Sequence, residues 1–199
     1  MEEINNTHPV WNESFRNYQN SISGTQLKII ILGPADSSPG YQKRVEIRNH
    51  LSNLSSNYDV SFPEQIKVPE NILPDTSRWK SVDFLVGEAD IIFALLIDDK
   101  RVTGVLGEIT KYGERQGFRE KAFILVPKKR KARKGSYLPQ IWAEVADYPS
   151  ERKLYYSDEE FKDCSKIRDY VSANADLRRK RICWEEFIKS RGLADSSYQ

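Results

Sequence analysis

The chain has 199 residues, of which 39% are hydrophobic and 30% charged, and its formal net charge is +2. This length is enough for one domain with a substantial core, or for one domain plus an extension. No apolar run approaches the roughly 18–20 residues of a membrane span, and we expect no signal peptide. Two cysteines without a CxxC motif and two histidines exclude a disulfide framework and a histidine-rich metal site. We therefore expect a cytoplasmic protein without metal or cofactor.

In chain order, the sequence begins with a polar segment and then predicts alternating strands and helices. Residues 1–25 predict an arm or short helix around Trp11 and Phe15, and residues 66–80 predict a loop. The predicted strands are 27–33, 58–65, 89–97, 121–127 and 152–157. The predicted helices are 40–56, a segment from Trp79 to Leu85, 105–117, 140–146, and the chain from Asp158 onward, capped by Ser157 or Asp158.

Strands separated by helices indicate βαβ units, and hence a doubly wound α/β fold with about five mostly parallel strands, flavodoxin- or Rossmann-like. Runs such as IIIL and IIFALLI are apolar on both faces, as expected when helices cover both sides of a sheet. We expect 27–33 and 89–97 to be central. The predicted division is an N-terminal arm (1–25), the α/β domain (26–157), and a C-terminal helical segment (158–199) packed on that domain.

Unusual residues follow the predicted strands, at the edge where ligands gather in such folds. Gly33-Pro34 follows the first strand, Pro63-Glu64 ends the second, and Asp98-Asp99 follows the third. A basic run follows the fourth. These positions together predict a ligand site at the carboxyl edge of the sheet.

The motifs IIILGP, VSFPE, ADIIFALL, TGVLGE and AFILVP together resemble the nucleoside 2-deoxyribosyltransferase-like superfamily, which includes nucleotide N-glycosidases and is distantly related to TIR domains. The resemblance covers about residues 27 to 130. In that family a Gly-Pro loop follows the first strand, an aspartate ends the third, and a glutamate follows a glycine by four residues. This chain matches with Gly33-Pro34, with Asp98 or Asp99, and with Gly104 followed by Glu108.

The resemblance implies cleavage or transfer of an N-glycosidic bond on a nucleoside, a nucleotide or NAD, in some relatives as antiviral defence. Such a reaction builds positive charge on the sugar, which a carboxylate stabilises or traps while a second acid protonates the base. Glu108 would be the nucleophile or stabiliser, and Asp98 or Asp99 would face the base. The alternative is that Glu108 only stabilises the first turn of a helix. Family members commonly complete their sites across a homodimer interface.

The segment 33–44 is the second candidate site, because a strand, a small polar loop and a helix start expose backbone N–H groups that suit a phosphate. Ser37, Ser38 and Arg44 would add contacts to the ligand, and Tyr41 would orient the glutamate. Thr103 and Gly104 complete the predicted ligand-binding set. The alternative is an ordinary Pro-Gly loop with a solvated arginine.

A basic run forms the third candidate, with six cations in seven residues: Lys128, Lys129, Arg130, Lys131, Arg133 and Lys134. We interpret it as a solvated loop; contact with a polyphosphate, nucleic acid or acidic partner is the alternative. We interpret the aromatic residues Trp142, Tyr155, Tyr156 and Trp184 as core. Two other functions remain open. One is a non-catalytic nucleotide sensor, favoured by Thr110 and Tyr112 where the family has small residues, and the other is a nucleic-acid-binding or scaffold protein.

Overall fold

The computed structural model describes residues 9–35, 38–67, 78–99, 102–129 and 131–190. In these ranges the elements are α1 (Pro9–Gly24), β1 (Leu27–Leu32), α2 (Pro39–Leu54), β2 (Tyr58–Ser61), η1 (Pro63–Gln65), α3 (Arg78–Glu88), β3 (Ile91–Leu95), α4 (Thr103–Gly113), α5 (Gln116–Arg119), β4 (Ala122–Pro127), α6 (Leu138–Glu144), η3 (Ser150–Arg152), β5 (Lys153–Tyr156), α7 (Asp158–Asp163) and α8 (Ser165–Ser190).

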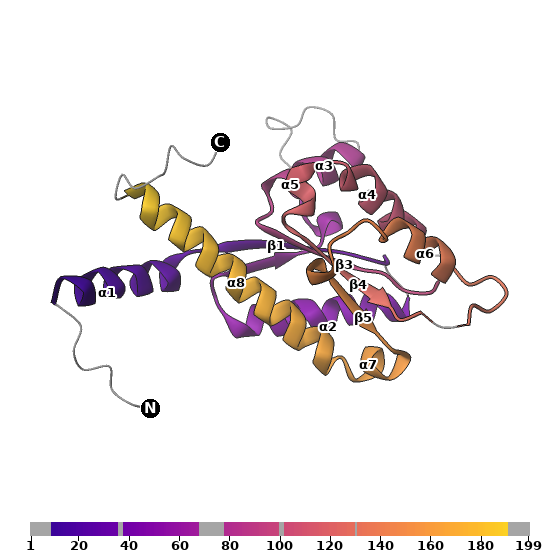
Figure 1. The fold of residues 1–199 in the computed structure, drawn as a ribbon. Helices are drawn as coiled ribbons and strands as arrows, with labels where there is room; N and C mark the ends of the chain where they lie inside the picture. Colours follow the sequence, from indigo (N-terminus) through magenta and orange to yellow (C-terminus); the bar gives the residue numbers. More distant parts are fainter. Residues whose placement is uncertain (1–8, 36–37, 68–77, 100–101, 130, 191–199) are drawn as a thin grey trace.

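The five strands form one sheet in the order β2-β1-β3-β4-β5, and every neighbouring pair is parallel. This is one of the common doubly wound orders, in which the direction of winding reverses between β1 and β3. The predicted fold class is therefore confirmed, with the segments around β1 and β3 at the centre (Figure 1). The carboxyl ends of these two strands meet at the switch point.

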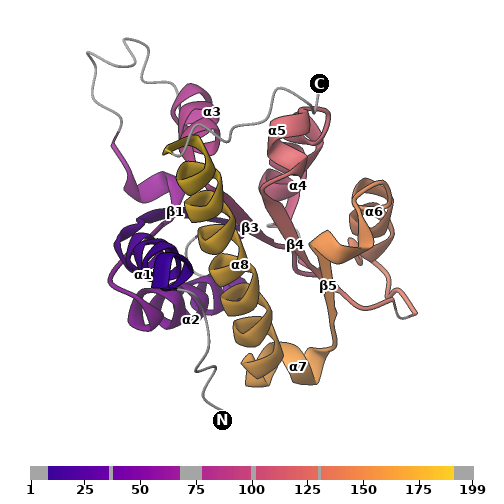
Figure 2. The ribbon, with the colours of Figure 1, turned by 60° about the vertical axis from the view of Figure 1, so that its left-hand side comes forward.

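Helices cover both faces of the sheet, so the central strands are apolar throughout (Figure 2). Alternate side chains of β1 enter different cores. Ile29 and Ile31 pack with α2 and α8, whereas Ile30 and Leu32 pack with α3 and α4. Each strand thus contributes to two hydrophobic layers, which explains why the sequence shows unbroken apolar runs rather than alternation.

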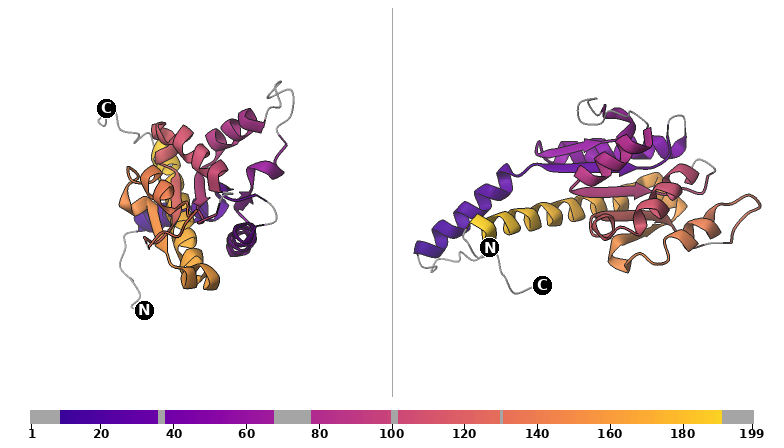
Figure 3. Two further views of the ribbon diagram at one scale, coloured as in Figure 1. Left: turned by 90° about the vertical axis from the view of Figure 1, so that its right-hand side faces the viewer. Right: turned by 90° about the horizontal axis from the view of Figure 1, so that it is seen from above.

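The helix α8 is longer than the sheet is wide. At 26 residues it extends over about 39 Å, and its far end pairs with α1 beyond the domain (Figure 3). There Tyr18 contacts Trp184 edge to face, with ring centroids 5.7 Å apart. Trp184 is half exposed and Tyr155 is also exposed, so these two lie outside the core, although Trp184 packs against Tyr18. Tyr156 is buried and Trp142 packs on the core, as expected for core and packing residues. Within the described ranges, no helix combines the length and apolar character needed to cross a bilayer.

Three predicted boundaries were wrong for local reasons. The second strand stops at Ser61, because Pro63 lacks the N–H that would continue the ladder and opens the 3-10 turn η1. The predicted helix 105–117 begins earlier, at Thr103, and ends at Gly113 before the short α5. The C-terminal helix is broken at Cys164, whose φ of 63° ends α7 in a left-handed cap.

One buried arginine connects the two loops that follow β1 and β2. Arg44 of α2 is 1% exposed, and its guanidinium forms a bidentate pair with Glu64 of η1 at 2.8 and 3.2 Å. The same group donates to the carbonyls of Ile31 and Pro34. Its stem passes so close to Gly33 that a Cβ there would lie 2.6 Å from Cδ of Arg44. The glycine is therefore required by the arginine that crosses it.

We predict that Arg44→Ala lowers the free energy of unfolding by about 2–4 kcal/mol, because it leaves the buried carbonyls of Ile31 and Pro34 without their donor and opens a cavity. The Glu64 side chain is 33% exposed, so water replaces part of its lost contact. Glu64→Gln keeps some of these bonds and should cost about 1.5–3 kcal/mol. Arg48→Ala is the matched control: it removes an arginine of the same helix that also lies against Phe62 but is less buried. Denaturant unfolding measures all three. Equal losses for Arg44→Ala and Arg48→Ala would contradict this account.

Candidate functional site

The carboxyl edge of the sheet contains a cavity of about 210 Å³. Its walls come from the start of α2, from the loop after β3, and from the ends of β4 and β5 with α7. The lining residues are Gly40, Ile97, Asp98, Asp99, Pro127, Tyr156, Asp158 and Phe161. A cavity below the ~300 Å³ of typical small-molecule sites suits a single ring or a sugar, so a larger ligand would extend outside it.

The walls of this cavity combine carboxylates with an aromatic face. Asp99 and Asp158 supply carboxylates, and the rings of Tyr156 and Phe161 stack with centroids 5.2 Å apart. Gly40 lies in the first turn of α2, where the helix dipole is positive. A Cβ at Gly40 would lie 2.8 Å from Ile97 and 2.9 Å from Pro34. The loops after β1 and β3 thus meet at this position, as the sequence predicts for the switch point.

The carboxylate of Asp98 holds the far end of the basic loop 128–137. It accepts hydrogen bonds from the Ser136 hydroxyl at 3.0 Å and from the backbone N–H of Tyr137 at 2.7 Å. These contacts fix the entry into α6, which follows directly. Asp98 therefore has a clear structural role at the cavity, whatever further role it has toward a ligand.

The near end of the same loop is held by Glu160 of α7. Lys128 pairs with this carboxylate at 2.9 Å, and the backbone N–H of Lys128 donates to Tyr156. Hydrogen bonds from Lys166, Lys128 and the backbone N–H of Ser157 lower the pKa of Glu160 to about 2. Because the pKa is depressed in the folded state, these contacts stabilise the fold above pH 4.5 and are lost as the pH falls toward 2.

The predicted phosphate loop has its polar groups already engaged by the protein. Ser38 caps α2, its hydroxyl accepting from the N–H of Tyr41 at 3.1 Å. The ring of Tyr41 lies against Phe62, with centroids 5.9 Å apart, and Arg44 is committed to Glu64 and to the Pro34 carbonyl. The prediction of a solvated or ligand-facing Arg44 therefore needs correction, because its guanidinium is buried. Ser37 lies outside the described residues.

Glu108 is the sixth residue of α4, not a first-turn residue as the sequence suggested. It is half-buried and lies one turn before Tyr112, on the same side of the helix. Among the described residues that line the carboxyl-edge cavity, Glu108 does not appear. Thr103 and Gly104 are exposed at the start of α4, and a Cβ at Gly104 would meet nothing within 4 Å.

The two large residues that follow Glu108 pack α4 against its neighbours. Tyr112 is fully buried against Phe118, and its hydroxyl contacts the carboxylate of Asp83 on α3. Burial raises the pKa of Tyr112 strongly, and the charges of Asp83 and Glu108 add to the effect. Thr110 donates to Glu144 of α6 at 2.7 Å. These residues build the helical layer rather than a ligand surface.

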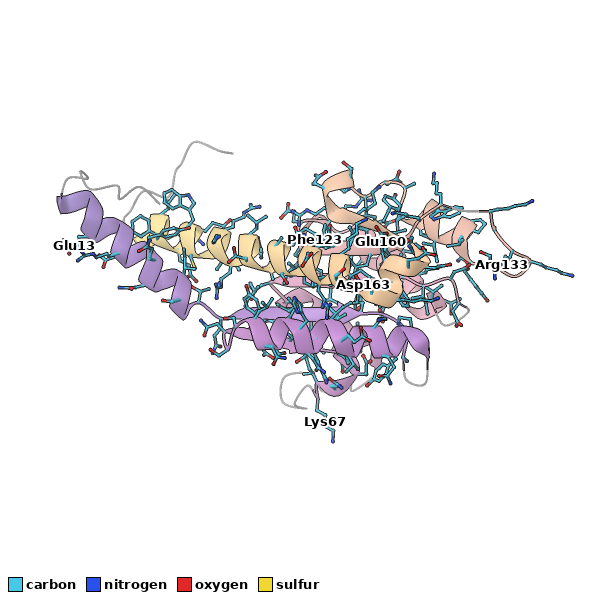
Figure 4. All side chains as sticks on the ribbon, turned by 90° about the horizontal axis from the view of Figure 1, so that it is seen from below. Glu13, Lys67, Phe123, Arg133, Glu160 and Asp163 are labelled. Atoms are coloured by element: carbon cyan, nitrogen blue, oxygen red, sulfur yellow. The ribbon has the colours of Figure 1, made fainter. Side chains whose placement is uncertain are left out.

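The basic loop projects away from the domain beyond its two anchors. Lys129, Lys131, Arg133 and Lys134 are exposed, and Figure 4 shows Arg133 at the outer end of the loop. Arg130 lies outside the residues that the structure describes. None of these described cations is among the residues that line the carboxyl-edge cavity.

Sequence reasoning missed Asp158 and the aromatic wall. Asp158 was considered only as a helix cap and Tyr156 only as a core residue, and Phe161 was not among the candidate site residues. A usable signal existed, since Asp158 follows the fifth strand and the carboxyl ends of parallel strands meet at one edge. Applying that rule to every strand would have included it.

We predict that Asp98→Ala increases the rate of trypsin cleavage within 128–134 several-fold, because the loop loses its far anchor and opens locally more often. Ser136→Ala, which removes one of the two donors, should give a smaller increase. Asp59→Ala, an exposed aspartate on β2, serves as control. Unchanged cleavage in Asp98→Ala would show that the loop is ordered by other contacts.

Comparison with known proteins adds little to this geometry. No family model matches the sequence, and no curated protein matches it. A structure comparison finds similarity to a conserved protein from Enterococcus faecalis V583 at 15% identity, with a TM-score of 0.42. The match covers 77% of this chain and 99% of that chain. A similarity at this level carries no inference about function.

Proposed function

We propose that this protein binds a nucleoside, a nucleotide or NAD at the carboxyl edge of its sheet and cleaves or transfers the N-glycosidic bond. The observation that carries the proposal is the cavity at that edge, where Asp99 and Asp158 stand beside the stacked Tyr156 and Phe161. Carboxylates accept from sugar hydroxyls and exocyclic amines, and aromatic faces contact a base or sugar ring. The cavity volume of about 210 Å³ suits one of these two rings.

The chemical step in this proposal uses two carboxylates with different duties. As the glycosidic bond breaks, Glu108 stabilises or traps the sugar cation, the role that the family resemblance gives it. Asp99 protonates the departing base. Asp98 is less suited to donate a proton, since its two oxygens accept hydrogen bonds from Ser136 and Tyr137. Water, in hydrolysis, or an acceptor base, in transfer, then takes the sugar and releases the Glu108 carboxylate. Because Glu108 is the sixth residue of α4 and does not line the cavity, the ligand would extend beyond the cavity to the middle of that helix.

The second candidate is a nucleotide sensor without catalysis. It is favoured by one observation: the described residues around the cavity do not include Glu108. In a sensor, Asp99 and Asp158 of the cavity would recognise the ligand, and bound ligand would remain intact. Antiviral defence is compatible with both candidates and belongs to the proposal through the family resemblance.

The enzyme and the sensor differ in whether free base is released from nucleosides, nucleotides or NAD. We predict that Glu108→Gln lowers turnover by at least about 100-fold, because it removes the negative charge that stabilises the sugar cation. Its free energy of unfolding should change by no more than about 1 kcal/mol, since the side chain is partly exposed. Base release is followed by chromatography.

Glu114→Gln is the matched control, because it makes the same change at the exposed end of α4 and should retain full activity. Asp99→Asn should also lower turnover. Full activity in Glu108→Gln would remove the assigned nucleophile. Saturable ligand binding without base release would support the sensor instead.

A further inference from the structure

A second cavity lies at the opposite, amino-terminal edge of the sheet. Its volume is about 300 Å³, and it lies between α8 and the starts of β4 and β5. Phe123, the second residue of β4, contributes to its wall, and Figure 4 shows this residue beside α8. The carboxyl-edge site uses none of these residues. The amino-edge cavity is therefore a separate feature of the fold.

Three guanidinium groups converge on this amino-edge cavity from two sides. Arg178 and Arg181 are one turn apart on α8, and Arg152 reaches in from the end of η3. The Arg152 guanidinium lies 4.5 Å from the ring centroid of Phe123, so one face of the cation is covered. Within the part of the chain that the structure describes, this guanidinium makes no hydrogen bond or ion pair.

The other two arginines are only partly engaged. Arg178 donates from Nε to the Asp90 carbonyl at 3.0 Å, and Arg181 donates from Nε to Glu185 at 2.8 Å. No hydrogen bond of their terminal amino groups is found among the described residues, and both side chains line the cavity. Glu151 is the single carboxylate among the described lining residues. Burial lowers the pKa of Arg152; Glu151 and Tyr170 oppose this shift, and the charges of Arg178 and Arg181 add to it.

Three cations with only Glu151 in the cavity wall and Glu185 beside Arg181 repel one another, and a bound anion would relieve this repulsion. Guanidinium groups present paired N–H donors whose spacing matches the oxygens of phosphate. We propose that the amino-edge cavity binds a compact phosphate-bearing anion, held by Arg152, Arg178 and Arg181. This site is independent of the N-glycosidic chemistry proposed for the carboxyl edge.

The surroundings favour a compact anion over a nucleic-acid strand. A neighbouring hollow shares Glu151 and Arg152 with the cavity, and its walls also include Glu114, Glu120 and Arg119. A long polyanion leaving the cavity in that direction would meet three carboxylates and one further cation, so the hollow does not continue the positive lining of the cavity. The volume of about 300 Å³ is at the lower limit of small-molecule sites. A di- or triphosphate group fits this combination of size and charge.

Titration calorimetry with sodium pyrophosphate, at constant ionic strength, tests the proposal. We expect saturable binding at one site in the wild-type protein. Arg152→Gln and Arg181→Gln should each weaken it at least about tenfold, because each removes a charge-assisted contact to phosphate. Arg181 is well exposed, so its substitution leaves the fold intact and decides the test even if Arg152→Gln loosens the packing on Phe123.

Two controls give the result its meaning. Lys180→Gln removes the same charge from the neighbouring position of α8, where the lysine pairs with Asp176 outside the cavity, and should leave affinity unchanged. The double substitution Lys131→Gln and Lys134→Gln in the basic loop should also leave it unchanged. The proposal is overturned by absence of saturable binding, by an equal loss in Lys180→Gln, or by loss in the loop variant. It is also overturned if a strand of about twelve nucleotides binds more tightly than pyrophosphate through Arg181.

Discussion

The pair between Arg44 and Glu64 determines the shape of the switch point. It joins α2 to the turn after β2, and through the carbonyls of Ile31 and Pro34 it also fixes the end of β1. A buried guanidinium needs partners for its donors, and here the two terminal amino groups make four hydrogen bonds to oxygen, while Nε is buried without a partner among the described residues. The end of β1 and the carbonyl of Pro34 are therefore held in place, and the start of α2 lies against Ile97 beside the carboxyl-edge cavity.

The two edges of the sheet have opposite charge arrangements. At the carboxyl edge, carboxylates line the cavity and the cations of the basic loop stand outside it, held by Asp98 and Glu160. At the amino edge, guanidinium groups line the cavity and carboxylates lie in the adjoining hollow. Since the net charge is only +2, neither the acidic lining of the carboxyl-edge cavity nor the basic lining of the amino-edge cavity follows from the overall composition. The ligands proposed for the two ends of the sheet accordingly differ in the chemical groups that they present.

The sequence was informative wherever burial alone decides structure. Unbroken apolar runs located the strands, and β-branched residues separated them from helices. It was less informative where a tertiary partner decides. Arg44 looks like a solvated helix residue until Glu64, twenty positions later, is brought beside it. The start of α4 was misplaced because Val102 provides no side-chain cap, so no local signal marked Thr103. The carboxylates at 98 and 99 were placed correctly at the edge, since strand ends follow from the strand pattern. The donors to Asp98, which are Ser136 and Tyr137, belong to a loop nearly forty residues away.

The pairing of α1 with α8 has a consequence for the order of folding. The hydroxyl of Tyr18 donates to the Lys180 carbonyl, and Thr25 meets Cys183, so the first helix of the described chain rests mainly on the last. During synthesis α1 leaves the ribosome long before its partner exists. Because the sequence of α1 is polar, with few apolar side chains, this segment can stay exposed to water until α8 has been synthesised. The α/β sheet can then assemble first, and closure of this helical pair becomes a late step of maturation.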